Sequence, residues 1–343
     1  MTDLPISLVS PEPTGQQGPQ KRATVPFISV VLAVALAACF VWVPWENVSG
    51  GGFPDRDNYI AAIDALLRTG ARLFDFSDAD VLSVLMNEYL WREVLLFIGG
   101  YFAEPLNGLL LISFFAAALT AFHVIRRAGV VYAMVFLLSP LSIDLFMSQT
   151  RSALAVGIFL SALAVRSAPL RYALFVAAFL FHSFAAILFA AYLFNEFLLA
   201  RAAMGTRLKF SAVLLAALFA SVIWAFLAQY VLGLIGDRRA LQEAILPTSV
   251  AFALWWILLT FMLVAFARIN SREGNAQYVM LAIFLQAMFV FSTLMGAGGL
   301  RFLSLSLPMV FIAIRSIRAP ILRLAAMAGT IGFNLVGFSY WMS

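Results

Sequence analysis

The sequence predicts an all-α, polytopic integral membrane protein with about 9–11 transmembrane helices. Composition is the first reason: 63% of the 343 residues are hydrophobic, 11% are charged, and the mean hydropathy is +0.97. A soluble domain carries about 45–50% apolar and about 25% charged residues. The second reason is that apolar runs long enough to cross about 30 Å of hydrocarbon recur along the chain. The third is that basic residues cluster between these runs, as they do in cytoplasmic loops.

The N-terminal segment, residues 1–24, is expected to be a disordered cytoplasmic tail, because it is rich in proline and glutamine and poor in large apolar residues. Residues 25–343 then form a single polytopic membrane domain. Lys21 and Arg22 precede the first apolar run near 26–45, which places the N-terminus in the cytoplasm. The residues that end this run make a poor cleavage site, so we expect an uncleaved first span.

The loop 46–93 is the largest element outside the predicted spans, and it is extracytoplasmic in this topology. It is markedly acidic, with few arginines to balance its carboxylates. Apolar residues at helical spacing predict a short amphipathic helix over 59–67. Ser77 or Asp78 is a suitable N-cap for a second short helix.

Most of the later spans follow directly from the apolar runs. They are predicted near 104–125, 129–147, 152–168, 210–235, 250–267, 277–295, 302–316 and 324–341. The run 170–200 is too long for one untilted span and short for two. We favour a broken helical hairpin whose two short helices meet near His182, because it keeps every basic cluster on the cytoplasmic side. The alternative is one long tilted helix, which would invert the rest of the chain.

Several classes of function are excluded or disfavoured. The chain has one cysteine and two histidines, which makes a classical zinc site improbable, and we expect no metal and no cofactor. It has no phosphate-binding glycine-rich loop with its lysine and no nucleophile elbow. The net charge of +5 comes from clusters between spans, which favours membrane topology and no nucleic acid as a partner.

The first candidate site follows the first span. Asp55 and Asp57 flank Arg56, and Tyr59 lies one helical turn beyond Asp55. Such a group suits hydrogen bonding to sugar hydroxyls, or a carboxylate acting as a general base. The structural alternative is a solvated turn at the start of an interfacial helix.

The second candidate group consists of Glu88 and Glu104, which lie before and after a short aromatic stretch. Either carboxylate suits contact with a polar substrate. Glu104 also has a structural explanation, because an acid at a helix N-terminus followed by Pro105 in the first turn is a favourable helix start.

The third group is built on arginines near predicted membrane boundaries. Gln149 and Arg151 begin an apolar helix, Arg301 begins another, and His182 lies at the predicted helix break. Ionisable groups at such depth usually face a cavity, a partner or a substrate. An arginine fork matches a diphosphate. The alternatives are an arginine that anchors in headgroups and a histidine that bonds to a neighbouring helix.

Four segments, in order, resemble the EpsG/Wzy-like family of bacterial exopolysaccharide and O-antigen polymerases. They are Asp55-Arg56-Asp57-Asn58-Tyr59-Ile60, Glu104-Pro105-Leu106-Asn107, Ser148-Gln149-Thr150-Arg151-Ser152-Ala153-Leu154-Ala155 and Phe181-His182-Ser183-Phe184-Ala185-Ala186. The resemblance covers residues 26–316. The chain departs from the family pattern at Arg56 and Asn58, which leaves open whether Asp55 or Asp57 is the functional acid.

The resemblance implies a metal-independent membrane glycosyltransferase of the bacterial inner membrane. Its substrate would be a polyprenyl-diphosphate-linked oligosaccharide repeat unit, and the growing glycan would be transferred to the next lipid-linked unit on the outer face. A chain-length regulator and a flippase of the same pathway would be partners, along with membrane lipid. A flippase for the same units and a glycan ligase are the alternative functions.

The same resemblance assigns roles to the candidate residues. Asp55, Asp57 or His182 would assist proton transfer. Arg151 and Arg301 would bind the diphosphate. The remaining substrate contacts would come from Arg56, Tyr59, Glu88, Glu104 and Gln149.

Overall fold

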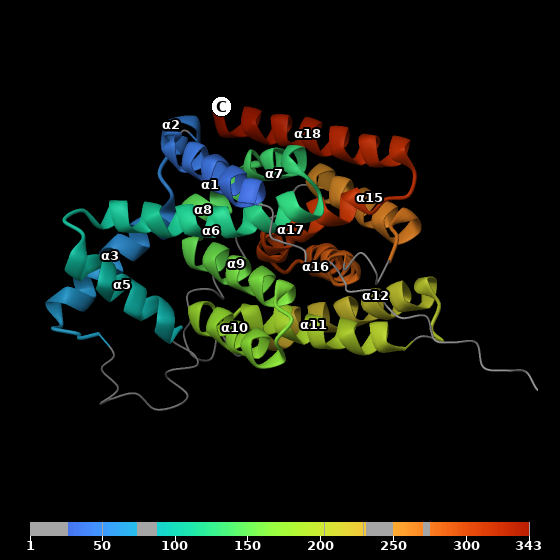
Figure 1. Ribbon diagram of the computed structural model, residues 1–343, viewed down its shortest axis with the longest axis horizontal. Coiled ribbons are helices and arrows are strands. Elements are labelled where there is room, and N and C mark those ends of the chain that lie inside the picture. Colours follow the sequence, from blue (N-terminus) through green and yellow to red (C-terminus); the bar gives the residue numbers. More distant parts are fainter. Residues whose placement is uncertain are drawn as a thin grey trace, which may run out of the picture.

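The computed structural model describes residues 27–49, 51–73, 88–201, 203–228, 230, 250–269 and 275–342. Every regular element in these ranges is helical, and a single isolated bridge pairs Ala267 with Ile317. The helices pack side by side in one bundle (Figure 1). The predicted all-α polytopic membrane class is therefore confirmed.

The first half of the chain is built from α1 (Phe27–Trp42), α2 (Trp45–Ser49), α3 (Pro54–Arg68), α5 (Tyr89–Tyr101), α6 (Pro105–Arg127), α7 (Val130–Leu137), α8 (Pro140–Met147) and α9 (Thr150–Ala164). The second half contains α10 (Ala168–Phe181), α11 (Ala185–Ala200), α12 (Thr206–Val222), the π-helix η1 (Ile223–Ala228), α15 (Val250–Phe266), α16 (Ala276–Leu294), α17 (Leu300–Arg315) and α18 (Pro320–Met342).

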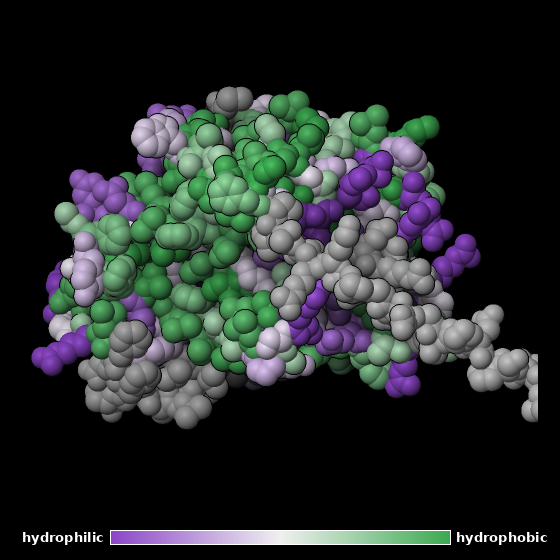
Figure 2. Space-filling view, viewed as in Figure 1, coloured by the Kyte–Doolittle hydropathy of each residue, from purple (hydrophilic) through white to green (hydrophobic). Residues whose placement is uncertain are grey.

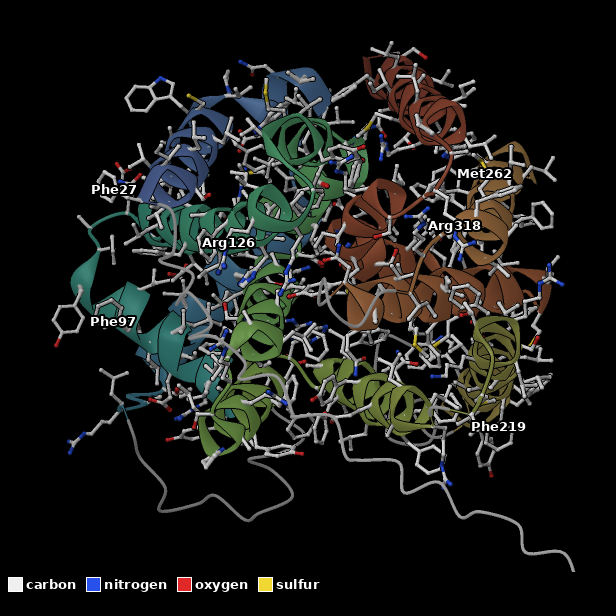
Figure 3. All side chains as sticks on the ribbon, turned by 45° about the vertical axis from the view of Figure 1, so that its right-hand side comes forward. Phe27, Phe97, Arg126, Phe219, Met262 and Arg318 are labelled. Carbon is white, nitrogen blue, oxygen red and sulfur yellow. The ribbon has the colours of Figure 1, made fainter. Side chains whose placement is uncertain are left out.

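Helices α16 and α17 form the centre of the bundle. Almost every residue of α17 is buried, and α16 is buried along most of its length. The surrounding helices expose large apolar side chains instead, such as Phe27, Phe97 and Phe219, which point away from the bundle (Figure 3). Hydrophobic residues cover the middle of the molecule, and hydrophilic ones gather toward its two ends (Figure 2). This is the surface expected of a protein surrounded by lipid.

Four described helices are long and apolar enough to cross a membrane, and a bent pair makes a fifth. Five shorter apolar helices of 10–17 residues accompany them. These elements coincide with the predicted apolar runs. The number of spans, about 9–11, stays a prediction, because it depends on whether the shorter helices also cross.

The run 129–147 differs from the single straight span that we expected. It is split into α7 and α8, whose axes are bent by 72°. Pro140 explains the break, because proline at the start of α8 has no N–H to continue the hydrogen-bond ladder of α7. Helix α8 leads, after Ser148 and Gln149, directly into α9, where Arg151 lies.

The predicted hairpin over 170–200 is confirmed. Helix α10 ends at Phe181, and α11 begins at Ala185. Arg171, near the start of α10, donates a hydrogen bond of 3.0 Å to the hydroxyl of Tyr192, in the middle of α11, and lies 3.8 Å from the carboxylate of Glu196, one turn further on. The rings of Phe175 and Tyr192 lie 4.8 Å apart. The two helices are therefore antiparallel, and the break at His182 is the tip of the hairpin.

The segment after the first span contains the amphipathic helix that we predicted over 59–67, which is part of α3. Helix α3 packs against α5 at one end of the bundle (Figure 1). The tail 1–24 and the second helix, expected after Ser77 or Asp78, lie outside the described residues. The sidedness of the loop 46–93 and of the N-terminus stays a prediction.

The topology of the hairpin gives a direct test. Single cysteines placed at Ser167 and Gly205, in a chain with Cys39→Ala, should both react with a membrane-impermeant maleimide from the same side of the membrane. The physical reason is that the hairpin returns the chain to the face from which it entered. A cysteine at Thr69 serves as the control and should react from the other side. Reaction of positions 167 and 205 from opposite sides would contradict the hairpin.

Candidate functional site

The candidate site is built around Glu88, which begins α5. Its φ and ψ angles are 53° and 57°, and it is the one residue other than glycine with a positive φ among those described. A non-glycine residue in this left-handed region is uncommon and costs free energy. The surrounding contacts must therefore hold the Glu88 backbone in this conformation.

Those contacts come from the break between α10 and α11. Oε1 of Glu88 lies 2.6 Å from Nδ1 of His182 and accepts bonds of 3.2 Å from both the N–H and the hydroxyl of Ser183. Arg151, in the first turn of α9, forms an ion pair with Oε2. Glu88 and His182 are each 3% exposed. A buried carboxylate is thus paired with a cation and fully hydrogen-bonded, which is the condition for keeping it charged.

The balance of forces on Glu88 favours its ionised form. Burial alone would raise the pKa of its carboxyl. The hydrogen bond from His182, the charge of Arg151 and the N–H of Ser183 act in the opposite direction and lower the pKa to about 2. Glu88 is therefore a carboxylate throughout the physiological pH range.

Arg151 is positioned by the short connection between α8 and α9. Gln149 donates a hydrogen bond of 2.7 Å to the carboxylate of Asp144, and the hydroxyl of Thr150 bonds back to the carbonyl of Phe146. Ser113 of α6 also donates to the Phe146 carbonyl, at 2.7 Å. These bonds fix the turn from which the Arg151 side chain reaches Glu88.

Tyr59 of α3 completes the near side of the site. The guanidinium of Arg151 lies 5.9 Å from the centre of the Tyr59 ring, a cation–π arrangement. The Tyr59 ring also packs edge-to-face on Trp91, at 5.0 Å. Burial raises the pKa of Tyr59 to about 12, and the charges of Arg151, Asp55, Glu88 and Arg301 also act on it. Tyr59 is therefore a neutral phenol within electrostatic range of both arginines.

An aromatic cluster of Phe184, Trp224 and Phe302 connects the segment after His182 to the start of α17, where Arg301 lies. The Phe184 ring, two residues after His182, lies 5.0 Å from the ring of Phe302, next to Arg301. Trp224 packs on both rings at 5.6 Å and 5.4 Å and donates a bond of 3.3 Å to the carbonyl of Gly298. Trp224 belongs to the π-helix η1, and such segments are frequent at functional sites.

A pocket of about 380 Å³ opens between α3 and α5, and Glu88 and Arg151 form its polar wall. The other lining residues are mostly apolar: Ala62, Ala65, Leu66, Thr69, Trp91, Arg92 and Leu95. The pocket therefore presents a cation beside an apolar surface.

The structure brings together Glu88, Arg151 and His182, with Tyr59 beside them and the charge of Arg301 within electrostatic range of Tyr59. Gln149 supports this group indirectly, because its side-chain amide is bonded to Asp144 in the turn before Arg151. Asp55 is half-buried, and its charge reaches Tyr59. Asp57 is exposed.

Two predicted site residues have partners elsewhere. Arg56 is buried and forms an ion pair with Glu46 of α2, so it joins α2 to α3. Glu104 is exposed and accepts a bond of 3.3 Å from the amide of Asn107, in the first turn of α6. Glu104 stands at the N-cap of α6, as expected of a helix start, but its side chain makes no capping hydrogen bond to the backbone. Substrate contact by either residue stays a prediction.

Sequence reasoning assigned no role in the site to Ser183, Trp91 or Asp144. Ser183 follows His182 directly, but nothing in the local pattern shows that its N–H and hydroxyl face Glu88. The one available signal was Asp144, an acid within an apolar run, which is a functional hypothesis by default. Its bond to Gln149 shows that it orients the turn before Arg151.

Among the described residues, no group of three or more histidine, cysteine, aspartate or glutamate side chains is arranged to hold a metal ion. Comparison of the chain with known protein families, with curated proteins and with solved structures finds no match. The function is therefore argued from the site itself.

Replacement of the Glu88 carboxylate tests the energetics of this site. Glu88→Gln should lower the free energy of unfolding at pH 7 by about 3 kcal/mol, because it leaves Arg151 without its buried partner. Thermal unfolding of the purified protein in detergent measures this. Glu104→Gln, which changes an exposed acid, should cost less than about 0.5 kcal/mol.

The pH dependence supplies a second readout. A carboxyl whose pKa is lowered on folding stabilises the protein fully above its unfolded value of 4.5 and loses this effect as the pH falls toward 2. The stability difference between the native chain and Glu88→Gln should therefore be constant from pH 8 to about 5 and should shrink below that. A difference that stays unchanged at pH 3 would contradict the account.

Proposed function

We propose that the chain is a membrane glycosyltransferase that polymerises polyprenyl-diphosphate-linked oligosaccharide repeat units. It would act in exopolysaccharide or O-antigen synthesis at the outer face of the bacterial inner membrane. The observation that carries the proposal is the buried group of Glu88, His182 and Arg151 beside an apolar pocket. The resemblance of the four sequence segments to the EpsG/Wzy-like polymerases also supports it.

The pocket suits a lipid diphosphate. Its apolar wall, formed by residues such as Leu66, Trp91 and Leu95, would contact the start of a polyprenyl chain. Arg151 would face the diphosphate, and Arg301 is within electrostatic range of the same region. Two arginines in a site of low dielectric stabilise the negative charge that develops on a departing diphosphate.

The pair of Glu88 and His182 suits general-base catalysis. A carboxylate only accepts hydrogen bonds, so Nδ1 of His182 carries the proton that faces Glu88. Nε2 then carries the lone pair that accepts a proton. In this arrangement Glu88 holds the tautomer and the orientation of His182, which is a positioning role rather than the direct sugar contact that we first expected.

The proposed reaction balances with these residues alone. A hydroxyl of the acceptor unit forms a bond to the anomeric carbon of the donor glycan, and its proton passes to Nε2 of His182. The bond between that carbon and the diphosphate oxygen breaks, and polyprenyl diphosphate leaves with the electron pair. Asp55 stays an alternative base, because its charge reaches Tyr59, four residues further along α3.

Polymer length in a strain that lacks the chromosomal gene tests the proposal. Plasmid-borne chains with Arg151→Gln or His182→Asn should lower polymer synthesis by about 100-fold or more, since the first loses anion stabilisation and the second the base. Gel electrophoresis of extracted polymer is the measurement. Arg68→Gln, an exposed arginine on α3 that does not line the pocket, is the matched control and should give normal polymer.

The lipid-linked intermediates separate the alternatives. Single repeat units should accumulate on the outer leaflet when the polymerase fails. Accumulation on the inner leaflet would identify a flippase, and full-length polymer that is not attached to its final acceptor would identify a ligase. Normal long polymer with a stably expressed Arg151→Gln chain would contradict the assigned roles.

A further inference from the structure

A second polar cavity lies at the other end of the bundle from Glu88. It has a volume of about 460 Å³. Its described lining is formed by Arg126, Arg127, Arg268, Asn275, Arg315, Ser316, Ile317, Arg318 and Arg323. Six arginines thus converge from the end of α6, the end of α15, the end of α17 and the start of α18. Hydrophilic residues are visible on the right of Figure 2, and Figure 3 labels Arg126, left of centre, and Arg318, toward the right.

Backbone hydrogen bonds join the two segments that carry Arg268 and Arg318 in this cavity. The N–H of Arg268 donates to the carbonyl of Ser316 at 2.9 Å, and the N–H of Arg318 donates to the carbonyl of Phe266 at 3.0 Å. Ala267 and Ile317, which form the bridge between these bonds, are 4% and 2% exposed. The backbone at Arg268 and Arg318 is therefore fixed by this pairing, and the two segments are anchored in the core through Ala267 and Ile317.

All charged residues in the described lining of the cavity are positive. No acid is found in it among the residues that the structure describes. Arg127 packs on the ring of Tyr278, with 5.2 Å between the guanidinium carbon and the ring centre. Asn275 is 9% exposed, and its Oδ1 has no hydrogen-bond partner in the structure. This Oδ1 is an acceptor and would take a hydrogen bond from a guanidinium or water, so the case for an anion rests on the six arginines and on the lack of an acid in the described lining.

A simpler explanation accounts for part of this pattern. Arginines are common in cytoplasmic loops, and Arg126, Arg127 and Arg315 lie in the last turns of their helices, where a cation is favourable. That explanation does not require the arginines to line one cavity. It applies equally to Arg201 and Arg207, which are exposed and do not line the cavity.

We propose that this cavity is a binding site for an anion that carries two phosphate groups. Several planar guanidinium groups match the oxygens of two phosphates, because each can donate paired hydrogen bonds. Anionic phospholipid headgroups and soluble diphosphates share this chemistry. A headgroup suits the position, since Ile321 and Leu324 on either side of Arg323 are 81% and 70% exposed and would contact acyl chains. The site is separate from the proposed transferase site and does not depend on it.

Binding of cardiolipin, a phospholipid with two phosphates, tests the proposal. The purified full-length chain in detergent is titrated with cardiolipin, and bound lipid is counted by native mass spectrometry. Arg315→Gln with Arg318→Gln should weaken binding by about 10- to 30-fold, from about 1 kcal/mol for each arginine lost. Arg201→Gln with Arg207→Gln is the matched control, because it removes two exposed arginines outside the cavity, and it should change binding by less than about twofold.

Inorganic pyrophosphate distinguishes the two sources. Failure of millimolar pyrophosphate to displace cardiolipin supports a lipid site, and displacement supports a site for a soluble diphosphate. Equal weakening by both double variants, or binding that does not saturate, would overturn the proposal. Thermal unfolding of each variant shows that the chain is folded, so loss of binding is not mistaken for loss of structure.

Discussion

The buried carboxylate of Glu88 is the group on which the rest of the site depends. It joins three parts of the chain: the start of α5, the break between α10 and α11, and the first turn of α9. A charge with 3% exposure is tolerated only when its partners are in place, so each of these segments constrains the others. The left-handed backbone of Glu88 and the break at His182 are both irregularities that this one ion cluster compensates.

The bundle supplies what the cluster needs. Broken helices leave backbone N–H groups without helical partners, and such groups are tolerated at membrane depth only where protein or a cavity satisfies them. Ser183 donates its N–H to Glu88, which meets this requirement. The bend at Pro140 starts the helix that leads into the turn before Arg151, and Trp224 of the π-helix donates a bond to Gly298, just before α17. Irregular backbone therefore occurs where the proposed chemistry requires polar groups.

Much of the fold was predictable, because the apolar runs that form the helices and the basic clusters between them are visible in the sequence itself. The hairpin at 170–200 followed from the requirement that Arg171 and Arg201 lie on one side. The site was predictable only in part. Arg151 and His182 stand out as ionisable residues in apolar sequence, but Glu88 is 94 residues from His182, and no local pattern encodes that contact. The pairing of Arg56 with Glu46 is similarly invisible in sequence. Propensity and spacing describe single segments, whereas these contacts are set by packing.

The coupling between Glu88 and His182 tests the central claim most directly. In a double-mutant cycle, unfolding free energies are measured for the native chain, Glu88→Gln, His182→Gln and the double variant. If the two side chains share one buried hydrogen-bonded pair, the effects should be non-additive by about 1–3 kcal/mol, with the double variant less destabilised than the sum. Effects that add to within about 0.5 kcal/mol would show that Glu88 does not hold His182, and they would contradict the account.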